Sequence, residues 1–178
     1  MSAAELQKFG IKVFAKDGAA IELDAFIPVF HRWIREHRVP GILVDVADYG
    51  HLPKGPGVVL VGHEADFYMD SMEGQLGLLY SRKLPQPGPF ADRLRASLQA
   101  AREACAALEA EPELEGRLTF DAADLLFLSN DRLVAPNTEE AFAALRPDLE
   151  AVFGGSGVRR EAGDPRRRLA ARLKAARG

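Results

Sequence analysis

Apolar and polar positions along the chain follow two periods, which predict strands alternating with helices. Short apolar runs and alternating positions are typical of strands, whereas apolar positions every three or four residues are typical of helices. The pattern predicts strands over residues 11–15, 42–46, 58–69 and 75–83, two short strands or one bent strand over 117–128, and a last edge strand over 158–161. It predicts helices over residues 26–37, over 89–111, and from Asn137 to about residue 153.

Two of these strands carry information beyond their position. The run over 42–46 is apolar except for Asp45, and such a run is typical of a strand that is covered on both faces. Residues 71–74 separate the strand over 58–69 from the returning strand over 75–83. Because this connection is short, we expect the two strands to pair antiparallel as a hairpin.

The helices have recognisable boundaries and faces. Phe26, Phe30 and Trp33 recur at helical spacing, which is typical of core residues. In the third helix, the pair Asn137 and Glu140 resembles a capping box at the start. Pro147 lies ten residues after Asn137, inside the predicted helix, and we expect this proline to kink or divide the helix.

These elements predict an α+β domain. The expected order is β-α-β-β-β-α-β-β-α, with a further β at the end, in which a mostly antiparallel sheet is backed by two or three helices. A split β-α-β arrangement related to the ferredoxin-like fold fits this order.

Length and composition narrow the class of protein. The 178 residues are enough for one domain with a substantial core, and 47% of them are hydrophobic. No apolar run approaches the roughly 20 residues of a membrane span, and the first residues lack the features of a signal peptide. The single cysteine, Cys105, excludes an internal disulfide framework. We therefore expect a cytoplasmic protein with an inert, buried thiol.

Charge divides the chain unevenly. The net charge is −3, yet residues 159–178 contain eight basic residues and two acids. We therefore assign residues 1–158 to a single α+β domain and residues 159–178 to a basic C-terminal tail. We expect the tail to be solvated and loosely ordered. Alternatively, it contacts an anionic polymer weakly through Arg166, Arg167 and Arg168.

The candidate chemistry lies near the strand that contains Asp45. If that strand is covered on both faces, Asp45 is partly desolvated and needs a hydrogen-bond donor, a cation or a proton. Asp48 and His51 follow it, and Glu64 belongs to the next predicted strand. Asp45, Asp48 and His51 are candidate ligands for a divalent cation such as magnesium or manganese, and Glu64 is a further candidate catalytic residue. The alternative is that Asp45 is a structural acid and Asp48 a turn residue.

The neighbouring acids have a simpler explanation. If residues 58–69 form one regular strand, alternation places His63 on the core side and places Glu64 and Asp66 on the other side. Glu64 and Asp66 then face Arg82 or Lys83 across the hairpin as exposed ion pairs.

Common catalytic motifs are missing from the sequence. Gly55-Pro-Gly57 precedes a strand and lacks the Lys-Ser/Thr pair of a phosphate-binding loop. The segment that begins at His63 has no second histidine at zinc-protease spacing, and no Gly-x-Ser-x-Gly elbow occurs. We therefore predict a soluble, non-catalytic protein that binds a ligand or partner. The alternative is a small metal-dependent, hydrolase-like enzyme that uses Asp45, Asp48, His51 and Glu64.

The long hairpin and its edge strands also predict a homodimer, because exposed strand edges require covering.

Several phrases resemble an uncharacterised family of bacterial conserved hypothetical proteins. They are Phe26-Ile-Pro-Val-Phe-His-Arg-Trp, Val44-Asp-Val-Ala-Asp-Tyr, Gly55-Pro-Gly-Val-Val-Leu-Val-Gly-His-Glu-Ala-Asp, Leu78-Leu-Tyr-Ser-Arg-Lys and Asn130-Asp-Arg-Leu-Val-Ala-Pro-Asn. The resemblance covers most of residues 10–165 and implies a bacterial, cytoplasmic protein. It implies no activity, cofactor or catalytic residue.

Overall fold

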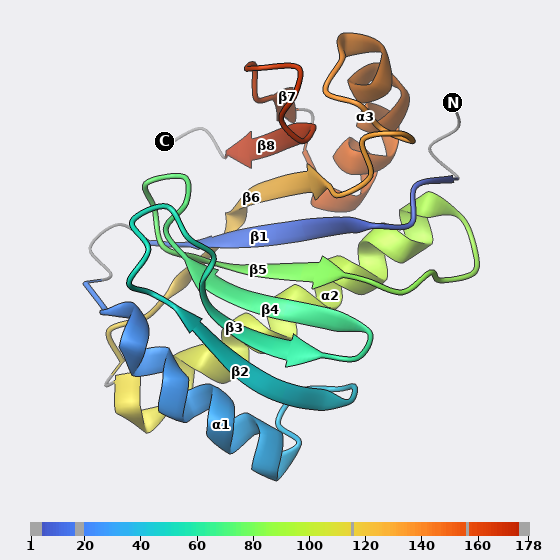
Figure 1. Ribbon diagram of the computed structural model, residues 1–178. Helices are drawn as coiled ribbons and strands as arrows, with labels where there is room; N and C mark the ends of the chain where they lie inside the picture. The colour runs from blue at the N-terminus through green and yellow to red at the C-terminus, as the bar shows by residue number, and fades with distance from the viewer. Residues whose placement is uncertain (1–4, 17–19, 115, 156, 175–178) are drawn as a thin grey trace.

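All strands of the described chain belong to one eight-stranded antiparallel sheet, and three α-helices cover one face of it (Figure 1). The computed structural model describes residues 5–16, 20–114, 116–155 and 157–174. In chain order the elements are β1 (Phe9–Ala15), α1 (Phe26–Glu36), β2 (Leu43–Tyr49), β3 (Gly57–Gly62), β4 (Ala65–Asp70), β5 (Gly77–Arg82), α2 (Phe90–Glu109), β6 (Phe120–Ser129), α3 (Glu139–Phe153), β7 (Arg159–Arg160) and β8 (Ala170–Lys174). The predicted α+β class with an antiparallel, helix-backed sheet is confirmed.

The strand order explains how the helices reach one face. The order across the sheet is β2-β3-β4-β5-β1-β6-β8-β7, and every neighbouring pair is antiparallel. Since β5 and β6 both pair with β1, they run parallel to one another with β1 between them, and α2 connects them. This is the predicted split β-α-β arrangement.

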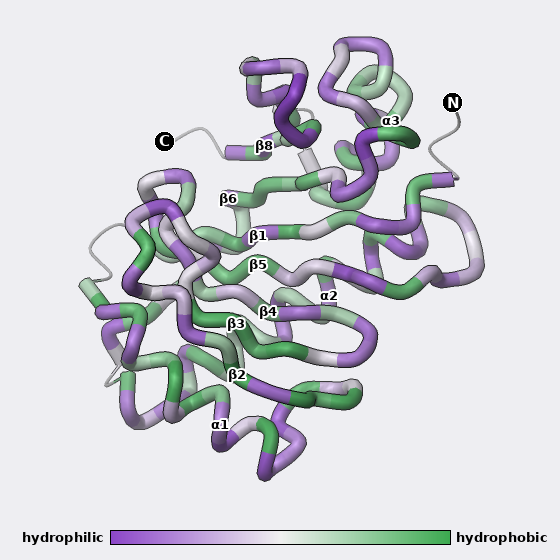
Figure 2. Tube along the Cα trace, in the orientation of Figure 1, coloured by the Kyte–Doolittle hydropathy of each residue, from purple (hydrophilic) through white to green (hydrophobic). Residues whose placement is uncertain are grey.

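The core lies between the sheet and the helices. Ile11 and Val13 of β1 are fully or almost fully buried there, together with Leu125 and Phe127 of β6. Phe127 contacts the rings of Phe9 and Phe90 at centroid distances of 5.8 and 6.2 Å. Figure 2 shows hydrophobic residues concentrated in the strands, whereas the connection between β7 and β8 is largely hydrophilic.

The predicted helical stripe is confirmed in α1, where Phe26, Phe30 and Trp33 are buried. The indole Nε1 of Trp33 donates a hydrogen bond of 2.6 Å to Glu111, which satisfies both polar groups inside the protein. The thiol of Cys105 is buried in α2, and burial raises its pKa, so the predicted inert cysteine is also supported.

Helix α3 differs from its prediction in two respects. It continues through Pro147 as one helix, so of the two expected effects of Pro147, a kink or a division, the division is wrong. Its first turn is capped by Thr138, whose side chain accepts a hydrogen bond from the amide of Ala141. The capping residue is therefore one position after Asn137, because Asn137 bonds instead to the segment that precedes β8.

The long strand predicted over residues 58–69 is two strands. The chain turns tightly after Gly62, and β3 and β4 pair with one another. His63 lies in this turn and is exposed, so its predicted position on the core side is wrong. The reason is that a turn of two residues leaves the apolar pattern on both sides almost uninterrupted.

Strand β2 forms one edge of the sheet and is not covered on both faces. Asp45 is exposed, and the register shifts beside it, between Leu43 and Asp45. The predicted desolvation of Asp45 is therefore wrong, because an apolar edge strand has the same sequence pattern as a buried central one.

Part of the predicted C-terminal tail belongs to the sheet. Residues 159–160 form β7, and residues 170–174 form β8, which pairs with β6. Leu169, Ala171 and Leu173 point into the core, so the expectation of a solvated tail is wrong for this segment. Residues 175–178 lie outside the described residues. Among the helices of the described chain, none has both the length and the apolar character that crossing a membrane requires.

Candidate functional site: an arginine-lined cavity

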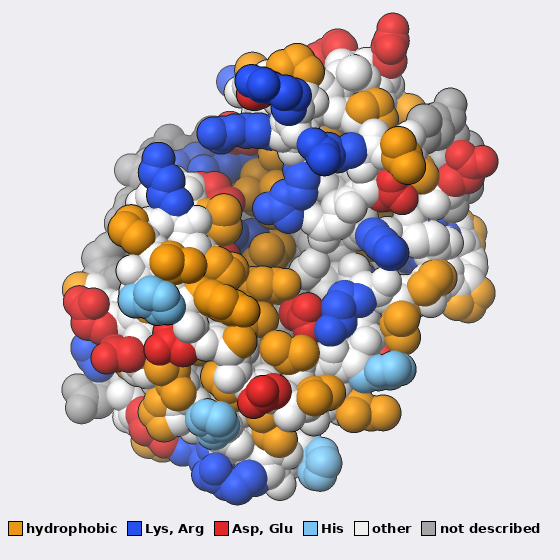
Figure 3. Space-filling view, viewed as in Figure 1, with side chains coloured by type: hydrophobic (Ala, Val, Ile, Leu, Met, Phe, Trp, Pro, Cys, Tyr) orange, Lys and Arg blue, Asp and Glu red, His pale blue; other side chains and the backbone are white. Residues whose placement is uncertain are grey.

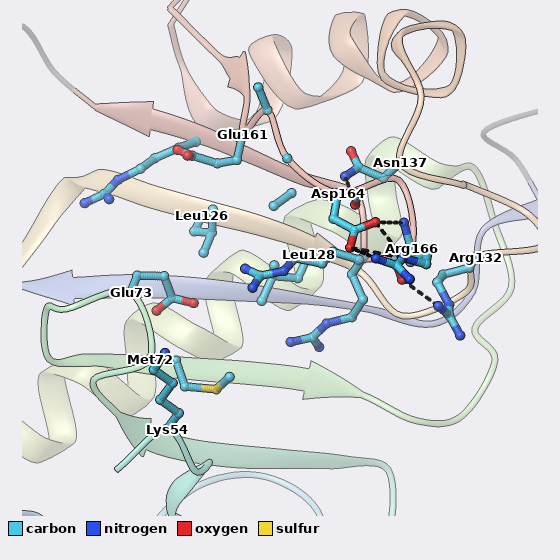
Figure 4. A pocket seen from close by; sticks show the side chains of 16 residues that line it. Lys54, Met72, Glu73, Leu126, Leu128, Arg132, Asn137, Glu161, Asp164 and Arg166 are labelled. Carbon is cyan, nitrogen blue, oxygen red and sulfur yellow. Dashed lines mark hydrogen bonds and ion pairs between the residues drawn. The ribbon is translucent and has the colours of Figure 1, made fainter.

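The face of the sheet opposite the helices, called here the open face, carries a cavity of about 920 Å³. Figure 3 shows Lys and Arg side chains gathered around a hollow on this face, and Figure 4 shows the lining from close by. The cavity, called here the arginine cavity, is lined by Lys54, Met72, Glu73, Leu126, Leu128, Arg132, Asn137, Glu161, Ala162, Gly163, Asp164, Arg166, Arg167, Arg168, Ala170 and Arg172.

The lining is strongly basic in an acidic protein. It contains six Lys or Arg side chains and three carboxylates, whereas the whole chain has a net charge of −3. Five of the six cations are arginines, whose planar guanidinium groups can bind carboxylate or phosphate through two parallel hydrogen bonds. The arginine cavity therefore favours an anion.

Strand alternation builds the floor of the cavity. Leu126 and Leu128 of β6 point to the open face, and Ala170 and Arg172 of β8 lie directly beside them. The other walls come from four loops: Lys54 precedes β3, Met72 and Glu73 connect β4 to β5, Arg132 and Asn137 connect β6 to α3, and residues 161–168 connect β7 to β8. The site thus combines an apolar floor with charged walls.

The loop over residues 161–168 is held by its own hydrogen bonds (Figure 4). The Asp164 carboxylate accepts bonds of 2.9 and 3.1 Å from the amide and the side chain of Arg166. These bonds lower the pKa of Asp164, with the side-chain bond contributing most. Arg132 donates to the carbonyl of Arg166 at 2.6 Å, and Asn137 donates to the carbonyl of Asp164 at 3.3 Å. The basic loop is therefore fixed from both sides.

Two further arginines are oriented by buried or half-buried partners. Arg172 forms a bidentate ion pair with Asp124 at 2.9 and 3.0 Å, and its guanidinium lies 4.0 Å from the centre of the Phe14 ring. Arg168 donates to Asn130 at 2.7 Å. By contrast, the structure gives no hydrogen bond or ion pair within the described chain for the side chains of Arg167 and Lys54. Those two cations are available to a ligand.

A buried charge cluster lies next to the floor. Lys12 of β1 is fully buried, and its amino group bonds to Asp70 at 2.5 Å and also to Glu73. Burial is the main reason that the pKa of Asp70 is raised, although Lys12 acts to lower it. Burial, followed by the nearby charge of Asp66, raises the pKa of Tyr68 on the same face.

The residues predicted as a metal or catalytic site lie elsewhere. Asp45, Asp48, His51 and Glu64 are all exposed on β2, the loop after it and the β3–β4 turn. Asp45 accepts a hydrogen bond of 2.8 Å from the amide of Val46, and Asp48 accepts one of 2.8 Å from Gly50. The alternative prediction, that Asp48 is a turn residue, therefore agrees with its hydrogen bond to Gly50. Within the described residues, no group of three or more His, Cys, Asp or Glu side chains could hold a metal ion.

Of the ion pairs predicted across the hairpin, the one between Asp66 and Lys83 is present, but Asp66 is buried and not exposed as expected. Lys83 lies 2.7 Å from the carboxylate of Asp66. Asp66 also accepts a bond of 3.1 Å from the amide of Gly62, so it fixes the β3–β4 turn as well.

Sequence reasoning missed Lys12 and Arg172, the two cations that contact Phe14. Strand alternation contains the signal, because Lys12 interrupts an apolar run and Arg172 alternates with the core residues Ala171 and Leu173. Comparison with known proteins finds no family model, no curated protein and no solved structure that matches the chain. The resemblance to bacterial hypothetical proteins therefore stays a prediction.

Proposed function

We propose that this protein is a non-catalytic binding protein whose ligand is a small anionic molecule held in the arginine cavity. The observation that carries the proposal is the excess of cations around the cavity in a chain that is acidic overall. The charge of Arg167 acts on the nearby Asp164, but the side chains of Arg167 and Lys54 form no hydrogen bond or ion pair within the described residues. An anion would therefore gain new contacts from them without breaking existing ion pairs.

The size and floor of the cavity support a small molecule with an apolar part. Its volume of about 920 Å³ lies within the range of roughly 300–1,000 Å³ that is typical of small-molecule sites. Leu126 and Leu128 provide an apolar surface beneath the charged walls. A ligand with a phosphate or carboxylate group on an apolar or planar body would match both parts.

The lining favours a small ligand over a single-stranded nucleic acid. Proteins that bind single strands combine a basic groove with aromatic side chains on which bases stack. None of the described residues that line the cavity is aromatic. We therefore propose that Arg166, Arg167 and Arg168, for which a weak contact with an anionic polymer was predicted, bind a compact ligand instead.

The lining also favours binding over catalysis. None of the described lining residues is a serine, cysteine or histidine, the side chains that most often act as nucleophiles or general bases.

Fluorescence titration with mant-ATP tests the proposal, because this probe joins a polyphosphate to an apolar, planar reporter. We expect saturable binding to the wild type and at least about tenfold weaker binding to the double variant Arg167→Gln/Arg168→Gln. Arg95→Gln is the matched control, because Arg95 lies on α2 and pairs with Asp92 at 2.5 Å. Displacement of mant-ATP by tripolyphosphate or by citrate identifies the preferred anionic group.

Three outcomes would contradict the proposal. The first is a lack of saturable binding by the wild type, and the second is an equal loss of binding in Arg95→Gln and in the double variant. The third is tighter binding of a 15-nucleotide oligodeoxythymidylate than of mant-ATP, which would indicate that the open face binds single-stranded nucleic acid.

We also propose that the protein forms a homodimer through β2. This strand is at an edge of the sheet, and Ile42 and Val44 beside its free edge are 66% and 60% exposed. Pairing of two edges would cover these side chains and the unpaired backbone groups. Sedimentation equilibrium should show a dimer for the wild type and a monomer for Val44→Lys, whereas a monomeric wild type would contradict the proposal.

The bacterial origin and the cytoplasmic location stay proposals too. The buried, free thiol of Cys105 supports a reducing compartment.

A further inference from the structure

The fully buried amino group of Lys12 has two carboxylate partners, Asp70 and Glu73. One carboxylate is enough to neutralise an ammonium group, so this cluster holds one negative charge more than Lys12 requires. The second carboxylate, Glu73, is also part of the wall of the arginine cavity. The excess charge is therefore located where the cavity would receive an anion.

Lys12 lies next to the cavity although it does not line it. In the sheet register, Lys12 is opposite Leu126 of the cavity floor, and Leu126 is opposite Arg172. The ring of Phe14 brings the two cations together, with Lys12 at 5.2 Å and Arg172 at 4.0 Å from its centre. Lys12 is thus one strand away from the floor and close to a cation that lines the cavity.

The two carboxylates differ in how firmly they are held. The Asp70 side chain is 2% exposed and also accepts a hydrogen bond of 3.0 Å from the amide of Met72. The Glu73 side chain is 29% exposed, and Lys12 is the only residue of the described chain with which it forms a hydrogen bond or ion pair. Glu73 also precedes Gly74, which has a positive φ of 76° at the end of the β4–β5 turn. Glu73 is therefore the partner that can leave Lys12 without exposing a buried carboxylate.

We propose that Lys12 is a concealed anion-binding group of the arginine cavity and that Glu73 occupies its place until a ligand phosphate or carboxylate replaces it. This inference rests on the proposed function. The replacement exchanges one anion for another on the same ammonium group, while Asp70 stays bound to Lys12. The ligand anion then lies between Lys12 and Arg172, and Glu73 moves into solvent.

The proposal predicts that Glu73 competes with the ligand. The variant Glu73→Gln removes the competing charge and leaves the Lys12–Asp70 pair intact. Glu161→Gln is the matched control, because Glu161 also lines the cavity but its side chain forms no hydrogen bond or ion pair within the described residues. Both variants remove one negative charge from the same lining, so only direct competition for Lys12 distinguishes them.

Titration of the wild type and both variants with mant-ATP tests this inference. We expect Glu73→Gln to bind about tenfold more tightly than the wild type, and Glu161→Gln to bind no more than about threefold more tightly. Urea unfolding of each variant verifies that it is folded, and Glu73→Ala provides a second variant that also lacks the charge.

The outcomes separate the inference from the function on which it rests. Binding by the wild type with equal affinities for Glu73→Gln and Glu161→Gln would overturn the role of Lys12 and leave the proposed function standing. Weaker binding by both Glu73→Gln and Glu73→Ala would do the same, because it would make Glu73 a ligand contact. If the wild type does not bind the probe, the proposed function fails, and the inference that rests on it fails with it.

Discussion

The two faces of the sheet use the same strands for different purposes. On β1, Ile11 and Val13 point toward the helices and are surrounded by apolar side chains, whereas Lys12 and Phe14, which alternate with them, point to the open face. On β6, Phe127 enters the core while Leu126 and Leu128 form the floor of the arginine cavity. The helix-covered face therefore supplies most of the stability, and the open face has the chemical variety that binding requires.

The difference between the faces also concerns buried charge. Lys12, Asp70 and Asp124 are buried on the open face, and each has an oppositely charged partner. Buried charges of this kind contribute little net stability, but removal of one partner is costly. We infer that ion pairs determine how side chains are arranged on the open face, whereas close packing of apolar side chains determines their arrangement on the covered face.

The largest loss of stability should come from a substitution that leaves an empty space in the core on the covered face. Phe127→Ala removes a ring that packs against Phe9 and Phe90, and we expect it to lower the free energy of unfolding by about 3–5 kcal/mol. Leu128→Ala, the next residue but on the open face, should cost less, about 1–2 kcal/mol, because the adjoining space is already open. Urea unfolding measures both values, and a larger loss for Leu128→Ala would reverse the comparison.

The next effect concerns the buried pair on the open face. Lys12→Met leaves Asp70 buried without its cation, so we expect a loss of about 3 kcal/mol in the free energy of unfolding. Adding Asp70→Leu to Lys12→Met should recover part of this loss, because the unpaired carboxylate is then removed. Strictly additive losses in the double variant would show that the pair is not coupled.

A smaller loss of stability is expected when Arg172, which lines the arginine cavity, is replaced. Arg172→Met removes the bidentate partner of the buried Asp124, and we expect it to cost about 1–2 kcal/mol. Arg146→Met is the control, since Arg146 pairs with Glu150 on the surface of α3 and such pairs contribute roughly 0–1 kcal/mol. Equal losses in urea unfolding would mean that the Asp124 pair behaves like an ordinary surface pair.

The smallest effect is a dependence of stability on pH. Burial raises the pKa of Asp70 in the folded state, so folded Asp70 takes up a proton at a pH at which the unfolded chain does not. As the pH falls from neutrality toward about 4, this group therefore contributes added stability. The variant Asp70→Asn lacks the contribution, so its free energy of unfolding should decrease more steeply than that of the wild type. A less steep decrease would contradict the assignment.

Periodicity was sufficient to predict much of the covered face. The stripe of Phe26, Phe30 and Trp33, the long helix α2 and the β4–β5 hairpin all depend on contacts between residues that are near in sequence. Such patterns are visible in one sequence because burial on a single side imposes them.

The open face could not be predicted in the same way. The edge position of β2 depends on how distant strands pair, and the local pattern around Asp45 does not contain that information. The arginine cavity requires β8 to pair with β6, which brings Arg172 to Asp124 across 48 residues. The basic composition of the last residues concealed the alternation of Leu169, Ala171 and Leu173, which marks β8 as a strand.

Mapping of amide chemical shifts by ¹H–¹⁵N NMR during a titration with tripolyphosphate tests the central claim most directly. The account predicts saturable shifts concentrated in β8, in the loop over residues 161–168 and at Glu73, with the amides of α1 and α2 unchanged. Shifts confined to the helix-covered side or to β2, or shifts that do not saturate, would contradict the assignment of the arginine cavity as the binding site.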